Sequence, residues 1–142
     1  MPRRTSSSTE FQASVAALCA ADRIRVRASA VVGPAGLSLS QYNTLRILRG
    51  EGAPLPIMEI RRRLIERTPG ITRLVDRLEQ LGLVERCPCD TDRRATMCEI
   101  TPAGRRVLKT LDDPMERSDR AAMTDLSKPD LKQLTALLRR VR

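Results

Sequence analysis

The sequence predicts a mainly α-helical protein with one small β-hairpin. Apolar residues recur at helical spacing in several separate segments, and Ser, Thr or Pro residues suited to helix starts precede most of them. Only residues 83–101 combine two β-rich runs with a turn-rich loop between them. With 142 residues, 41% of them apolar, the chain can form a folded core, and we expect one domain over 1–142.

A basic arm and a long helix are expected at the N-terminus. Residues 1–7 have the composition of a flexible arm, and the helix should begin near Ser7, because Ser7 and Glu10 have capping-box spacing. The helix should cover 8–32 and end at "GPAG", 33–36. Its apolar positions are Phe11, Val15, Leu18, Ala21, Ile24, Ala28 and Val31.

Three more helices are expected between residues 37 and 82. Ser38 and Gln41 form a capping box for the first, which should end at Gly50, before a turn with the sequence "GEGAPLP". The second is short, with Ile57, Ile60 and Leu64 on one face and Arg61, Arg62 and Arg63 on the other. The third should have Thr68 as its N-cap, Pro69 as its first residue and Gly82 as its stop.

Two short strands, at 83–87 and 96–101, should then form the hairpin. Two short helices joined by a tight turn and followed by a β-hairpin make a winged helix-turn-helix. We therefore expect such a lobe over residues 37–101.

Residues 102–142 predict two C-terminal helices. Thr101 and Pro102 repeat the pattern of a capping threonine followed by proline, and Pro114 should kink or restart this helix. Ser127 should cap the last helix, whose apolar stripe is too continuous to leave in water. Helices at 8–32 and 102–142 are thus expected to form a homodimer, through Phe11, Val15, Leu18, Leu131, Leu134 and Leu138.

Composition limits the classes of function. The formal net charge is +9, from 26 basic and 17 acidic residues, which favours a polyanionic partner such as nucleic acid or an acidic membrane surface. No apolar stretch is long enough to span a bilayer and no secretory signal is evident, so we expect a cytoplasmic location. There is no histidine, and no glycine-rich phosphate loop, which argues against an enzyme; no cofactor is expected.

The helix after Thr68 carries the strongest functional signal. If Ile71, Leu74, Val75 and Leu78 face the core, a small and basic face is left outward, as in a recognition helix that reaches base edges. Arg73 and Arg77 are like charges four residues apart, which weakens an isolated helix and suggests selection for something other than stability. The residues expected at DNA here are Thr68, Pro69, Gly70, Thr72, Arg73 and Arg77, with Asp76 also outward.

Three segments resemble the MarR family of bacterial transcription regulators: "SLSQYNTLRILRGEG", "TPGITRLVDRLEQLGLVER" and "DTDRRATMCEITPAG". The resemblance covers about residues 37–108. It implies a homodimeric winged-helix repressor or activator of promoter DNA, and for this chain we expect a repressor. Each subunit would place one helix in the major groove and a wing against the minor groove, and an unidentified signal, such as a small-molecule inducer, would release the DNA.

The same resemblance implies roles in the wing. Asp92 and Arg94 occupy its Asp-x-Arg motif, so that Arg94 would enter the minor groove and Asp92 would orient its guanidinium, with Arg93 beside them. A narrow minor groove has a deep negative potential that favours an inserted arginine. The alternative is a local salt bridge at a turn, which contributes little at a surface.

Three cysteines lie in the wing, and two interpretations stay open. Cys87 and Cys98, on opposite strands, are close enough in register to face each other, and nearby Arg86 and Arg93 could make a thiol reactive. Oxidation at Cys87, Cys89 or Cys98 would then distort the wing and release DNA. Alternatively, these thiols are small apolar residues that pack a thin hairpin. A structural zinc site is not expected, because zinc needs four ligands, the wing offers only three cysteines and no histidine, and the Cys-x-Cys spacing is unusual for zinc.

Two further hypotheses compete with a DNA-binding regulator. An acidic or apolar outward face on the helix after Thr68 would favour a winged-helix module that binds only proteins. The face is instead small and basic. A cysteine-based redox-sensing regulator would depend on the wing thiols.

Overall fold

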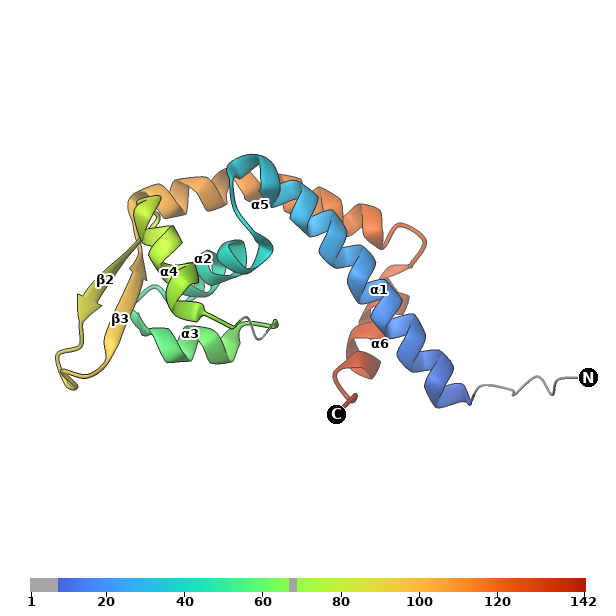
Figure 1. The fold of residues 1–142 in the computed structure, drawn as a ribbon. Helices are drawn as coiled ribbons and strands as arrows, with labels where there is room; N and C mark the ends of the chain where they lie inside the picture. Colours follow the sequence, from blue (N-terminus) through green and yellow to red (C-terminus); the bar gives the residue numbers. More distant parts are fainter. Residues whose placement is uncertain (1–7, 67–68) are drawn as a thin grey trace, which may run out of the picture.

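The computed structural model describes residues 8–66 and 69–142 and has the predicted fold class, mainly α-helical with a small antiparallel sheet. In Figure 1, a lobe built around the sheet lies at one end of the long helix α5, and α1 packs along α5 at the other end. The elements in chain order are α1 (Thr9–Val32), the 3₁₀ turn η1 (Gly33–Ala35), α2 (Leu39–Glu51), β1 (Leu55–Pro56), α3 (Ile57–Arg63), α4 (Ile71–Gln80), β2 (Val84–Pro88), β3 (Thr96–Ile100), α5 (Pro102–Ala122) and α6 (Lys128–Leu138).

The predicted hairpin is present, and it has a third strand that the sequence did not predict. The sheet is antiparallel with the order β1-β3-β2, and Leu55 and Pro56 of β1 pair with Cys98 and Met97 of β3. We expected a turn over these residues. A strand of two residues has no alternating pattern to recognise, and Pro56 fits it only because β1 is an edge strand, where a missing N–H is tolerated.

Most of the predicted helix starts are confirmed. Ser38 and Gln41 form the expected reciprocal capping box, and the hydroxyls of Thr101 and Ser127 accept hydrogen bonds from the first turns of α5 and α6. The N-cap of α1 is Ser8, whose hydroxyl accepts a hydrogen bond from the Phe11 amide at 3.2 Å. Ser7, and with it the arm at 1–7, lies outside the described residues.

Helix α4 begins later than predicted. Its N-cap is Gly70, with φ at +87°, and the first helical residue is Ile71. The expectation that Pro69 is the first helical residue is therefore wrong: a left-handed backbone at Gly70 cannot continue a right-handed helix, so the helix starts after it. Thr68, the expected N-cap, lies outside the described residues.

Helix α5 does not restart at Pro114 but continues to Ala122. A proline inside a helix costs about 3 kcal/mol. Leu108, Leu111 and Met115 are buried along one stripe of α5 on both sides of Pro114, and each fully buried side chain contributes about 1.5–3 kcal/mol. Tertiary packing thus outweighs the local preference of proline.

The core is aliphatic, as the scarcity of aromatic residues requires. Residues from α1, η1–α2, α3, α4, the sheet and α5 meet in one cluster, in which Tyr42 is the single aromatic side chain. Arg49 of α2 binds Asp112 of α5 through two hydrogen bonds of 2.8 and 2.9 Å and so holds the lobe against α5. The most deeply buried members are Val32, Leu45, Leu48, Ile60, Val75, Leu78, Val84, Cys98 and Leu108.

The outer helices leave apolar surface uncovered. Helix α6 has no buried residue, and the N-terminal half of α1 exposes Phe11, Val15 and Leu18, with Leu18 at 71%. On α6, Leu131 and Leu134 are half-buried, whereas Leu137 and Leu138 are each 49% exposed. For most of their length, these apolar faces therefore do not pack on the core of their own subunit.

Gly104 forms the joint between the wing and α5, and Gly104→Ala should destabilise the fold by about 1–3 kcal/mol. A Cβ there would lie 2.3 Å from the Leu83 carbonyl oxygen and 2.7 Å from Ile100 Cγ1. Urea unfolding measures the effect. Gly50→Ala, in a helix with open space around the glycine, is the matched control and should stabilise by about 0.5–1 kcal/mol. Equal effects from both substitutions would contradict this account.

Candidate nucleic-acid interface

Helix α4 presents two different faces, as predicted. Ile71, Leu74, Val75 and Leu78 are buried, whereas Thr72, Arg73 and Arg77 are exposed. Pro69 and Gly70, just before the helix, are exposed as well. The apolar stripe therefore fixes the helix on the lobe and leaves a small, basic surface over its first two turns.

Both acidic residues of α4 are bound by one arginine of the wing. The guanidinium of Arg86, on β2, donates to Asp76 Oδ1 at 2.6 Å and to Glu79 Oε2 at 2.5 Å. Asp76, which we expected to face outward, is thus half-buried and engaged. The sequence did not single out this role of Arg86. The signal was available in the i, i+3 spacing of the two acids and in a basic residue on the adjacent strand.

Other arginines of the lobe are also engaged within the chain. Arg49 pairs with Asp112, Arg62 pairs with Glu59, and Arg63 pairs with both Glu51 and Glu59. The hydrogen bond from Arg49 holds the pKa of Asp112 below its ordinary value. Among the described residues, the exposed arginines of the lobe that form no ion pair are Arg46, Arg61, Arg73, Arg77, Arg93 and Arg94.

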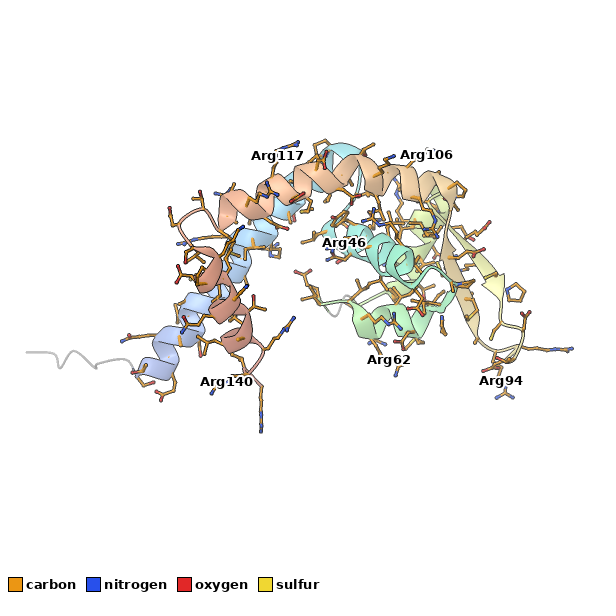
Figure 2. The ribbon with its side chains drawn as sticks, turned by 180° about the vertical axis from the view of Figure 1, so that it is seen from behind. Arg46, Arg62, Arg94, Arg106, Arg117 and Arg140 are labelled. Carbon is orange, nitrogen blue, oxygen red and sulfur yellow. The ribbon has the colours of Figure 1, made fainter. Side chains whose placement is uncertain are left out.

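The wing tip is a turn built on Asp92. Its carboxylate Oδ1 accepts a hydrogen bond from the Arg94 backbone N–H at 2.9 Å, and its carbonyl accepts one from the Ala95 N–H at 3.1 Å. The carboxylate thus orients the backbone of Arg94 and not its guanidinium, which corrects the role expected for Asp92. Arg93 and Arg94 are both exposed, and Figure 2 shows Arg94 projecting from the wing tip.

The wing cysteines do not face each other across the hairpin. Cys87 lies opposite Met97, and Cys98 lies opposite Arg86, so the side chains of Cys87 and Cys98 project to different faces of the sheet. The expected cross-strand pair is therefore wrong by one residue of register. Cys98 is fully buried, Cys87 and Cys89 are half-buried, and Cys19 is exposed on α1.

The arginines near these thiols do not activate them. Burial raises the pKa of Cys98 to about 11 despite the charge of Arg86. Burial, followed by the charges of Glu99, Glu85 and Asp90, also raises the pKa of Cys87. Hydrogen bonding from Thr91, whose hydroxyl lies 3.3 Å from the sulfur, lowers the pKa of Cys89. Only one wing thiol is thus made more acidic, and a hydroxyl does so.

A shallow hollow of about 260 Å³ lies between α2 and the end of α3. The guanidinium of Arg46 stands 5.7 Å from the centre of the Tyr42 ring nearby. The hollow is lined by Asn43, Arg46, Ile47, Arg63, Leu64 and Ile65.

In the part of the chain that the structure describes, no helix has the length and hydrophobicity needed to cross a membrane.

Comparisons with known proteins agree with the fold. Residues 35–95 match a family model described as MarR family. The transcriptional regulator PecS of Dickeya dadantii is 31% identical over 107 residues, which span 74% of this chain and 64% of PecS. This chain thus matches less than two thirds of the length of that relative.

Solved structures give the same result. A MarR transcription factor from Planctomyces limnophilus is 31% identical, with a TM-score of 0.72 over 97% of this chain and all of the other. A MarR mutant from E. coli, solved with operator DNA, has a TM-score of 0.83 over 94% of this chain and 97% of its own, and at 19% identity it shows the fold alone. Because sequence and fold agree over nearly the whole length of the Planctomyces protein, this chain belongs to the MarR family of transcription regulators.

Proposed function

We propose that the protein is a homodimeric transcription repressor that binds pseudo-palindromic promoter DNA through α4 and the wing. The observation that carries this proposal is the distribution of paired and unpaired arginines. The acids of α4 are bound by Arg86, whereas Arg73 and Arg77 on the same helix have no ion pair among the described residues. Unneutralised arginines on a protruding face attract phosphates, and their ordering costs no internal salt bridge.

Each exposed group has a distinct role in this proposal. Thr72 and Arg73, in the first turn of α4, read base edges in the major groove, where arginine pairs well with guanine. Arg77 and Arg93 bind phosphates, and Pro69 and Gly70 keep the tip narrow. Thr68, which the sequence also predicts to contact DNA, lies outside the described residues.

The wing supplies the second contact. Arg94 enters the minor groove, and the Asp92 turn fixes the direction in which it leaves the backbone. E. coli MarR, which shares this fold, was solved with operator DNA, and this supports DNA binding by the present chain. A dimer with two such surfaces would occupy a promoter and exclude the transcription machinery.

The uncovered helices support the dimer. Phe11, Val15 and Leu18 of α1 and Leu131, Leu134 and Leu138 of α6 expose apolar area that a second copy would bury. A two-fold symmetric dimer places its two α4 helices in successive major grooves, with half-sites about 10 bp apart.

The experiment that tests the function is selection of bound duplexes from a random library, followed by affinity measurements over a range of salt concentrations. We expect an inverted repeat, and a slope of affinity against salt that counts several phosphate contacts. Recovery of no enriched sequence, together with no binding at low salt, would refute the proposal.

Arg94→Ala should weaken binding to the selected duplex by roughly tenfold or more without changing the unfolding midpoint, because a wing-tip side chain buries no core. Arg117→Ala removes the same charge from the outer side of α5, away from the lobe's lower surface in Figure 2, and is the matched control. Fluorescence anisotropy with labelled duplex measures both variants. Equal losses would mean that only net charge matters.

Arg73→Ala should change sequence preference, not affinity alone. A good base contact discriminates by about 1–3 kcal/mol, so the variant should lose preference at one position of each half-site. Repeating the selection with the variant reveals which position is relaxed. If Arg73→Ala instead lowers affinity by the same factor for every sequence, Arg73 is a phosphate contact and the assignment fails.

Leu138→Glu and Leu18→Glu should each shift the protein from dimer to monomer, because a charge in an apolar interface loses its hydration. Sedimentation velocity measures the assembly, and the same variants should lose specific DNA binding. Leu81→Glu, at an exposed leucine beside the wing, is the control and should leave the dimer intact. A dimer that survives both interface substitutions would place the interface elsewhere.

A further inference from the structure

The outer face of the small sheet carries sulfur atoms that DNA binding does not use. Side chains alternate along β2 and β3, so Val84, Arg86 and Cys98 project toward the core and α4. The opposite face carries the next residues in register, with Cys87 opposite Met97.

Three sulfur-containing residues line one hollow on this face. Cys87, Cys89 and Met97 border an open space of about 550 Å³ beside Pro54, at the base of the wing. Each is half-buried, so each is held by its neighbours and still reaches solvent. Cys98 projects to the other face, and Cys19 lies far along the chain on α1. Two thiols and one thioether thus share a space that the other cysteines do not enter.

The same face is acidic in a way that fold stability does not explain. Glu85 and Glu99 lie directly opposite each other on β2 and β3, and like charges at such positions destabilise a sheet. Neither forms an ion pair within the described residues, and Asp90 stands on the rim of the hollow. These carboxylates raise the local concentration of cations at the mouth of the hollow.

We propose that Cys87, Cys89 and Met97 form a binding site for a soft monovalent cation, Cu(I). Thiolate and thioether ligands select Cu(I) over harder ions. On binding, each thiol releases one proton to water and forms one copper–sulfur bond, while the Met97 sulfur adds a neutral third donor. The oxidation states of copper and sulfur do not change, and the ion, with the two thiolates, leaves one net negative charge beside the acidic residues.

The donor set excludes the more common alternative, zinc. Zinc in structural sites takes four ligands, and the described residues contain no group of three or more His, Cys, Asp or Glu side chains arranged to hold a metal ion. A Cu(I) ion needs only two or three soft donors. Here one of them is Met97, and methionine is not one of the four residue types in such a group.

The spacing of the two thiols is compatible with a shared ion. Cys89 directly follows the last residue of β2, and two residues of chain span at most about 7 Å. Two metal–thiolate bonds of roughly 2.3 Å each span about 4.6 Å, and rotation of the two side chains toward the hollow covers the remainder. Ligation would replace the contact between the Cys89 sulfur and the Thr91 hydroxyl.

The test is anaerobic titration of the reduced full-length protein with Cu(I) in competition with bathocuproine disulfonate, a chelator that a single exposed thiol cannot outcompete. We expect one Cu(I) per chain. Cys87→Ser and Cys89→Ser should each weaken binding by at least about a hundredfold, since loss of a direct ligand exceeds the ten- to hundredfold typical of outer-shell partners. Met97→Leu keeps the apolar volume and should weaken binding by about tenfold.

Cys19→Ser is the matched control and should bind Cu(I) as the wild type does. Circular dichroism of the metal-free variants checks that each is folded. The proposal would be overturned if the wild type fails to retain Cu(I) or if Cys87→Ser and Cys89→Ser retain it as tightly as the wild type does. Loss of Cu(I) binding in Cys19→Ser would also overturn it. None of these readouts involves DNA, so the result is independent of the proposed regulatory function.

Discussion

The surface that we propose to face DNA depends on the bridge from Arg86 to Asp76 and Glu79. This one guanidinium joins the wing strand β2 to α4, and it binds both of the acidic side chains that α4 carries. The pairs are partly exposed, so their contribution to stability is modest. Their larger effect is on charge: with both carboxylates engaged by Arg86, Arg73 and Arg77 are the charged residues of α4 that form no ion pair among the described residues. The buried apolar stripe thus sets the position of α4, and the Arg86 bridge sets its pattern of charge.

Local sequence signals were sufficient to predict the structure wherever a single residue determines the local backbone. Ser38, Thr101 and Ser127 start the helices that they were expected to start, because an N-cap depends on its own hydroxyl and the next three residues. The apolar stripe of α4 likewise identified its buried and exposed faces. The first residue of α4 was misjudged, since Thr68 and Pro69 and the left-handed Gly70 give competing local signals.

Features that depend on pairing between distant segments were not predictable in the same way. A shift of one residue in strand register moves every side chain to the other face, so the expected pairing of Cys87 with Cys98 failed although both strands were located correctly. Strand β1 exists only because β3 offers it an edge. Helix α5 continues across Pro114 because residues from other elements bury Leu111 and Met115. In each case tertiary contacts decided what the local pattern left open.

The wing combines two opposite requirements on the two faces of one thin sheet. Its core-facing side must be apolar and must present Arg86 to α4, whereas its outer side carries Glu85, Glu99 and the half-buried sulfurs. The tip beyond the sheet is held by Asp92, whose carboxylate accepts a hydrogen bond from the Arg94 amide and whose carbonyl accepts one from the Ala95 amide. Arg94 therefore has a fixed origin and a free guanidinium. An arginine positioned in this way loses mainly side-chain freedom when it enters a groove, since the loop is already ordered, and preorganisation of this kind improves affinity without any additional contact.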